Sequence, residues 1–349
     1  MNSAAAAGVS AVTMLHPPAN AGQRRFILPP ITERADGQPR RVGVELEFVA
    51  LAAREAAELT QHLFGGTLVE VSPFYFVLRD SRLGDFRVEL DSRHALKQPR
   101  YAEPAPDADW FDSLVDDLER ELQYLYSVAV SGILPLEIVT PPIPLRALAA
   151  LDPLVDALKL RGARGTEESL LYAFGVHLNP EAVAVERGYI LDVLRAYLLL
   201  EDWLRREVSP DLLRRALAFI TPFGKGYARL VLDPDYDEAR LVDDYLAANP
   251  TRYRSLDLLP LLAELDEAQV RARVSDRKVN RRPTFHYRLP DFRTTDPDWS
   301  LAGEWNRWVE VEKLAAEPAT LRELSLAYLE HDDRRHGDWA DRIAARLGL

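Results

Sequence analysis

The stretch "RVGVELEFV" (residues 41–49) decides the fold class, because apolar and polar residues alternate along it with the period of two that a β-strand requires. Side chains two positions apart on a strand point to the same face. Glu45 and Glu47 therefore stand side by side, opposite an apolar set made of Val42, Val44, Leu46 and Phe48. The pattern is typical either of a strand whose charged face meets solvent or of a strand whose adjacent, mutually repelling carboxylates hold a cation.

The composition restricts the classes of protein to which the chain can belong. It has 349 residues, of which 47% are hydrophobic and 28% charged, as in soluble globular proteins with one large domain or two small ones. The net charge of −12 disfavours nucleic acid or an anionic membrane as the main partner. The chain has no cysteine, which excludes disulfides, thiolate zinc sites, iron–sulfur clusters and a cysteine nucleophile.

The two ends of the chain differ from its middle. The opening "MNSAAAAGVSAVTML" lacks the basic n-region of a secretory signal, so we expect residues 1–25 to be a flexible tail and the protein to be cytoplasmic. No apolar run reaches the roughly eighteen residues that a membrane span needs. We expect residues 26–349 to form a single domain, because they contain no repeat or linker, with a helical cover over about 301–349.

Hydrophobic periodicity predicts an α+β fold with a largely antiparallel sheet. Helices are expected at 51–64, where Gly65 and Gly66 stop the pattern, and at 107–129, 144–159 and 188–219. Strands are expected at 67–71, 74–78, 86–90, 133–139, 170–178 and 283–291, and the second and third of these form a hairpin. Residues 228–233 are expected to be a strand or a loop.

Polar residues recur on these strands in the way that Glu45 and Glu47 do. The further same-face candidates are Glu89 and Asp91, Glu137, His177 and Asn179, and His286 and Arg288. If they line one face of one sheet, the carboxylates and imidazoles could hold Mg²⁺ or Mn²⁺. A guanidinium beside them suits a phosphate or a carboxylate.

Each candidate also has an ordinary structural interpretation. A single glutamate on an alternating strand usually faces solvent, and His177 alone is typical of a hydrogen-bonded core histidine. Asn179 precedes a proline and can cap a turn. The coincidence across five strands is what favours a shared site.

The motifs resemble those of the amidoligase family, within the superfamily of carboxylate–amine ligases that includes glutamine synthetase and glutamate–cysteine ligase. Four short motifs occur in the family's order: "GVELE", an acidic residue at Asp91, "EIVTPP" from Glu137, and "GVHLN" around His177. The closing strand of relatives reads E-x-R, whereas this chain has "HYR", with His286 in place of glutamate. That departure lowers the local negative charge by one, a change that bears directly on metal affinity and activity.

The resemblance implies an ATP-dependent ligase whose curved antiparallel sheet forms an active-site trough backed by helices. It implies Mg²⁺ or Mn²⁺ between the site and the ATP phosphates, and an acyl phosphate that an amine captures. Glu45, His177 and His286 would bind one metal ion. Glu47, Asp91 and Glu137, with Glu89 nearby, would bind a second one or the amine.

The resemblance also implies roles for cations. Arg288 would stabilise the transferred phosphoryl group, with Asp91 and Lys225 as further catalytic residues. ATP would be held by Lys225 in "FGKGYAR" and by Arg277 and Asn280 in "DRKVNRRP", where Arg281 and Arg282 are equally well explained as surface residues.

Two other functions remain open on these residues. One is a phosphotransferase or metal-dependent hydrolase with the same site, and the other is a catalytically silent protein that binds nucleotide or metal. The expected partners are a small-molecule carboxylate and an amine, or a peptide. The sequence does not indicate an oligomeric state.

Overall fold

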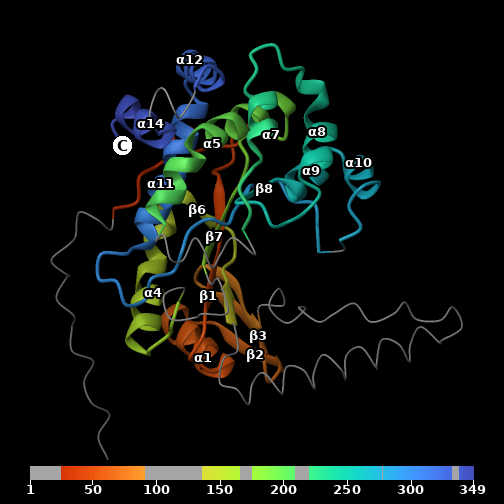
Figure 1. Cartoon of the computed structure of the whole chain (residues 1–349). Coiled ribbons are helices and arrows are strands. Elements are labelled where there is room, and N and C mark those ends of the chain that lie inside the picture. Colours follow the sequence, from red (N-terminus) through yellow and green to blue (C-terminus); the bar gives the residue numbers. More distant parts are fainter. Residues whose placement is uncertain (1–24, 91–135, 166–174, 209–219, 277, 332–337) are drawn as a thin grey trace, which may run out of the picture.

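The computed structural model describes residues 25–90, 136–165, 175–208, 220–276, 278–331 and 338–349 (Figure 1). Over these residues nine strands form one sheet in the order β2-β3-β4-β5-β1-β7-β9-β8, with β6 paired to β1. Every pair of these strands is antiparallel, so the predicted fold class is confirmed. The strands are β1 (Arg41–Phe48), β2 (Thr67–Ser72), β3 (Tyr75–Ser81), β4 (Gly84–Leu90), β5 (Leu136–Val139), β6 (Ile143–Pro144), β7 (Val176–Pro180), β8 (Leu256–Asp257) and β9 (His286–Tyr287).

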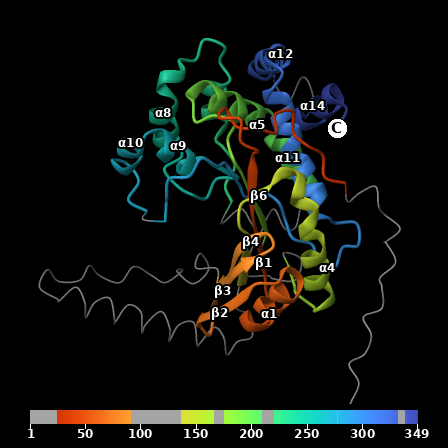
Figure 2. The ribbon, with the colours of Figure 1, turned by 180° about the vertical axis from the view of Figure 1, so that it is seen from behind.

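Helices flank the sheet, and both views show α4 and α11 on one side of β1 and α8, α9 and α10 on the other (Figures 1 and 2). The α-helices are α1 (Ala53–Phe64), α4 (Asp152–Leu160), α5 (Arg187–Glu207), α7 (Lys225–Val231), α8 (Leu241–Ala248), α9 (Leu259–Leu265), α10 (Glu267–Arg271), α11 (Leu301–Ala315), α12 (Pro318–Leu329) and α14 (Trp339–Leu347). Two 3₁₀ helices are η1 (Leu145–Leu151) and η2 (Glu238–Arg240). No helix in these described ranges has the length and apolar character needed to cross a membrane.

Strand β1 is central because its apolar face is fully buried and both of its edges are paired. Val42, Val44, Leu46 and Phe48 are all 0% exposed. Just before the strand, the buried Arg40 donates two hydrogen bonds to Glu312 on α11, at 2.7 and 2.8 Å. Trp308 Nε1 donates to the same carboxylate. This ion pair attaches the start of β1 to the helical layer.

The C-terminal helices α11, α12 and α14 all contact α5. Trp339 on α14 donates from Nε1 to the carbonyl oxygen of Leu199, and Ile343 is fully buried on the same helix. The amphipathic pattern of this segment therefore buries its apolar side against its own chain.

Several predicted elements differ from the structure. The expectation of a strand or loop at 228–233 is wrong: α7 buries Tyr227, Ala228 and Val231, a helical spacing that a short alternating window hides. The late strand at 283–291 is reduced to β9, with isolated bridges at Thr284 and Asp291. The long helix predicted at 107–129 lies outside the described residues, as do 170–174 and 209–219.

Candidate active site

The strand register brings the predicted carboxylates and imidazole to one face of the sheet. Glu45 on β1 lies opposite His177 on β7. On the other side, Glu47 lies opposite Glu137 on β5, which in turn lies opposite Glu89 on β4. Directly opposite residues on neighbouring strands have their Cβ atoms about 5 Å apart. The polar residues therefore form a continuous acidic floor, by which we mean Glu45, Glu47, Glu89 and Glu137.

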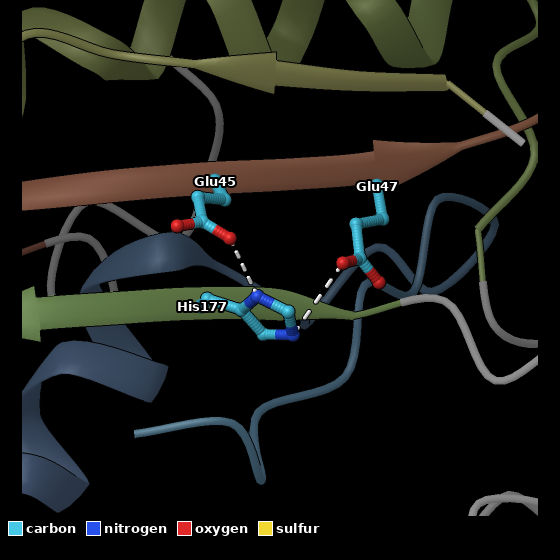
Figure 3. A group of neighbouring side chains, drawn as sticks. All are labelled: Glu45, Glu47 and His177. Atoms are coloured by element: carbon cyan, nitrogen blue, oxygen red, sulfur yellow. Dashed lines mark hydrogen bonds and ion pairs between the residues drawn. The ribbon is translucent and has the colours of Figure 1, made fainter. Parts of the chain in front are cut away.

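His177 lies between the two carboxylates of β1 (Figure 3). Its Nδ1 is 2.8 Å from Glu45 Oε2, and its Nε2 is 3.4 Å from Glu47 Oε1. Each of the three residues offers one ligand atom, and these atoms all lie within 4.8 Å of one another, the only such group found in the described ranges. Glu47 is 1% exposed and His177 is 2% exposed, so water provides little compensation for their charge.

The environment of Glu45 keeps it ionised. Burial alone would raise its pKa, but the hydrogen bond from His177, followed by the charges of His177 and Arg288, holds the pKa of Glu45 well below its usual value. Its second oxygen accepts a 2.8 Å hydrogen bond from Asn179 Nδ2. Asn179 therefore positions Glu45 rather than capping a turn alone.

Gly175 explains why the "GVHLN" motif begins with glycine. A Cβ atom at this position would lie 2.6 Å from the carbonyl oxygen of Pro290, which is too close for any side chain. The Gly175 amide donates to Glu47 Oε2 at 3.2 Å. The close approach of the two chain segments thus helps to hold the buried carboxylate in place.

Three carboxylates stand in one row across β1, β5 and β4. Like charges directly opposite each other on neighbouring strands destabilise a sheet, and Glu47, Glu137 and Glu89 are in this arrangement. Arg87 Nε partly compensates the row at 3.4 Å from Glu89 Oε1. Asp91, predicted to extend this row, lies outside the described residues.

A second buried group lies at the other end of the same face. Arg288 Nη2 is 3.2 Å from Asp257 Oδ2 and 3.3 Å from His286 Nδ1. Burial, followed by the charge of Arg288, lowers the pKa of His286 well below its usual value, so its imidazole is neutral at pH 7. Burial raises the pKa of Asp257, and the charge of Arg288 opposes that effect.

Glu45, Glu89 and Glu137 of the floor and His286 and Arg288 of the second group line one pocket of about 170 Å³, whereas Glu47 and His177 lie beneath it and do not line it. Five cationic and three acidic side chains line it, an excess of positive charge in a protein whose net charge is −12. We call Arg252, Lys278, Asn280 and Arg282, which come from the segments around α8 to α10, the cationic wall. The remaining lining residues are Glu45, Arg87, Glu89, Glu137, Val139, Pro260, His286 and Arg288.

The other predicted residues divide into three groups. Asn280, predicted to bind nucleotide, lines this pocket with Arg288. Lys225 begins α7 and lines a different pocket, together with Glu201 and Asp202, so the structure does not bring it to the acidic floor. Arg277 lies outside the described residues.

Sequence reasoning missed four cations of the pocket. Arg87 carried a usable signal, because it stands two positions before Glu89 on the same face of β4. Arg282 and Lys278 belong to "DRKVNRRP", where the sequence did not distinguish pocket residues from surface residues. Arg252 lies in an irregular segment, and no pattern in the sequence around it indicated a pocket residue.

The residues at this site fit a divalent cation. Two carboxylates and one imidazole form a donor set that Mn²⁺ accepts readily, and the oxygens suit Mg²⁺. A doubly charged cation would offset the charges of Glu45 and Glu47, each of which offers an oxygen within 4.8 Å of the other and of a His177 nitrogen. Glu45, Glu47 and His177 are therefore the residues that could hold it.

Comparison with known proteins gives a family for the chain. A family model described as "Putative amidoligase enzyme" matches residues 38–310, which include every strand of the sheet and the whole pocket. Searches of curated proteins and of solved structures found no significant match. The match covers well over half of the chain and spans the residues that form the acidic floor, so the chain belongs to the amidoligase family.

Proposed function

We propose that this protein is an ATP-dependent carboxylate–amine ligase of the glutamine synthetase and glutamate–cysteine ligase-like superfamily. The observation that carries the proposal is the division of one pocket into an acidic floor and a cationic wall. A polyphosphate with its metal ion needs both kinds of surface, since the ion requires oxygen ligands and the phosphates require cations. The family's description supports ligase activity, and our proposal adds that the reaction depends on ATP.

The floor residues would act first as ligands. Glu45, Glu47 and His177 would hold Mg²⁺ or Mn²⁺, which when bound supplies charge neutralisation for the phosphates. Asn179 and the Gly175 amide orient the two carboxylates. Glu137 and Glu89 would bind the ammonium group of the incoming amine or a second metal ion.

The wall residues would bind the nucleotide. Arg252, Lys278 and Arg282 offer positive charge toward the phosphates, and Asn280 offers an amide. Arg288, which Asp257 holds from behind, would stabilise the phosphoryl group in transfer.

The reaction has two steps. A carboxylate oxygen of the acid attacks the γ-phosphorus of ATP and ADP leaves, which gives an acyl phosphate. The amine nitrogen then attacks the acyl carbon, phosphate leaves, and the nitrogen loses a proton to give the amide. The chain's contribution is to position the reactants and to stabilise charge.

The test is Mg²⁺- and Mn²⁺-dependent release of ADP, measured with and without a mixture of amino acids, with mass spectrometry to detect an amide. Glu45→Ala and Glu47→Ala should both abolish the amino-acid-stimulated release. Glu58→Ala is the matched control, because Glu58 is an exposed glutamate on α1 that pairs with Arg54 away from the pocket.

The rival functions give different results in this assay. Transfer of phosphate to an acceptor, or release of ADP without an amide, would replace the ligase by a phosphotransferase or hydrolase. Tight binding of ATP without turnover would favour a silent binding protein. If ATP does not bind at all, the proposal fails.

A further inference from the structure

Two buried nitrogen atoms in the pocket lining have no hydrogen-bond partner among the described residues: His286 Nε2 and Arg288 Nε. Both residues line the pocket. His286 is 7% exposed and Arg288 is 8% exposed. Buried polar atoms are nearly always paired, so two such nitrogens in the lining of one pocket mark a place that suits a ligand with hydrogen-bond acceptors.

The contact between these two residues decides which nitrogen of His286 carries a proton. Arg288 Nη2 lies 3.3 Å from His286 Nδ1. A guanidinium offers donors only, so this contact requires a lone pair on Nδ1. The imidazole proton is then on Nε2, the atom without a partner. Metal binding through Nε2 needs the opposite tautomer, in which an N–H of His286 would face an N–H of Arg288.

The positions of both side chains are fixed by their neighbours. Asp257, which is 0% exposed, accepts from Arg288 Nη2 at 3.2 Å and pairs in register with His286 across β8 and β9. The backbone amide of Arg288 donates to the carbonyl oxygen of Ser255 at 2.9 Å. The tautomer is therefore built into the fold of this strand pair.

The surrounding charge favours an anion at this end of the pocket. Arg282 and Arg288 both act on His286 electrostatically, whereas Glu45 is the carboxylate that opposes them. Lys278 and Arg252 line the same pocket. An oxygen with negative charge would be met here by an N–H from His286 and by a guanidinium.

We infer that His286 and Arg288 form an anion-binding pair in which His286 Nε2 donates a hydrogen bond to a phosphate oxygen and does not bind the metal ion. The inference rests on the proposed function for the source of the phosphate, which is ATP. It changes the role that the resemblance implies for His286: the residue that replaces the family's glutamate holds the nucleotide, and the metal ion is left to Glu45, Glu47 and His177.

The first test needs no ligand. ¹⁵N-labelled histidine in the full chain, with the His286 signals assigned by their loss in His286→Gln, reports the tautomer from the chemical shifts and couplings of the ring nitrogens. We expect His286 to carry its proton on Nε2. A proton on Nδ1 would overturn the inference.

The second test separates metal from anion binding. His286→Ala should leave Mn²⁺ affinity without nucleotide unchanged, whereas His177→Ala should lower it. In the presence of Mg²⁺, His286→Ala should weaken ATP binding about tenfold. His286→Gln should restore most of it, because the amide of glutamine supplies an N–H donor. Equal losses of Mn²⁺ affinity in His286→Ala and His177→Ala would show that His286 is a metal ligand.

Inorganic phosphate distinguishes failure of this inference from failure of the proposed function. If phosphate shifts the His286 Nε2 signal but ATP neither binds nor turns over, the ligase proposal fails and the anion pair stands. If ATP is turned over to an amide and His286→Ala binds it as tightly as wild type, the anion pair fails and the ligase stands. A protein in which neither anion affects His286 would contradict the inference.

Discussion

The acidic floor stands on long paired strands, whereas the cationic wall stands on segments with little regular structure. Glu45 and Glu47 lie in the eight residues of β1, which is paired on both edges. Arg252, Lys278 and Arg282 lie between short helices and two-residue strands. Three of the four floor residues, Glu45, Glu89 and Glu137, nevertheless line one pocket with the wall.

The difference shows two ways of fixing a charged side chain. On the floor, strand register sets which residues face one another, and one shift of register would move every carboxylate to the other face. On the wall, individual contacts fix the positions of the residues. Arg252 Nε is 3.2 Å from Asp276 Oδ2, the Arg282 amide donates to the carbonyl of Pro260, and Val279 is fully buried. We expect floor variants to act through ligand geometry and most wall variants through charge.

The largest expected effect comes from the point where the two surfaces meet. Arg288→Ala removes the cation beside the fully buried Asp257, and loss of one partner of a buried ion pair costs about 3–5 kcal/mol. We expect the free energy of unfolding to fall by this amount in urea titrations at pH 7. Arg288→Met combined with Asp257→Asn should recover much of the loss, because neither member of this pair then carries a charge.

A failure of this recovery would change the interpretation. If the double variant is as unstable as Arg288→Ala, the loss would come from packing around Arg288 rather than from an unpaired carboxylate.

Glu45 on the floor and Glu201, which lies near the cationic end of the site, differ in the pKa of their carboxyl groups. The pKa of Glu45 is held low, whereas burial raises the pKa of Glu201 on α5 from 4.5 to about 7. Glu201 accepts a hydrogen bond from Ser255 Oγ, and the carbonyl oxygen of Ser255 accepts one from the Arg288 amide. Glu201 is therefore connected to Arg288 through Ser255.

This raised pKa predicts a loss of stability as the pH rises. The folded protein holds the Glu201 proton more tightly than the unfolded chain does, so the contribution to stability is complete below pH 4.5 and is lost as the pH passes about 7. The loss is about 3 kcal/mol at full ionisation. Unfolding free energies of Glu201→Gln minus those of wild type should therefore increase from pH 5 to pH 8. A difference that does not change with pH would contradict the shift.

Variants of the floor should change metal affinity instead. Glu45→Gln should lower Mn²⁺ affinity about 100-fold, and Asn179→Ala, which removes the hydrogen bond that orients Glu45, should lower it about tenfold. Electron paramagnetic resonance of free Mn²⁺ measures both. Equal effects of the two variants would mean that orientation matters as much as ligation, and the distinction between floor and wall would weaken.

The same difference explains what could be predicted from the sequence. The alternation of "RVGVELEF" was enough to place Glu45 and Glu47 on one face, and "GVHLN" was enough to place His177, because strand period is local information. The register that sets Glu47 opposite Glu137 is not local: burial of both apolar faces places the two glutamates on one face, but a shift of two residues would keep that burial and change the partner.

The wall could not be predicted in this way. Its members have no period, and Arg252 reaches the pocket through contacts with residues more than twenty positions away. Lys225 is the opposite case: a lysine between two glycines was expected to hold ATP, whereas it begins α7 and lines another pocket. The tautomer of His286 depends on Asp257 and Arg288 together, which only the folded strands bring into contact.

The smallest expected effect comes from a comparison of two neighbouring arginines, one in the wall and one on the surface outside the pocket. Arg282 lines the pocket, while Arg281 Nε donates to Glu264 at 3.1 Å outside it. Arg282→Ala should weaken ATP binding about tenfold at low salt, and less at high salt because an exposed charge is screened. Arg281→Ala should leave ATP affinity unchanged in the same calorimetric titration. Since both variants lower the net charge by one, equal losses would mean that ATP responds to overall charge, and the wall would not be a specific site.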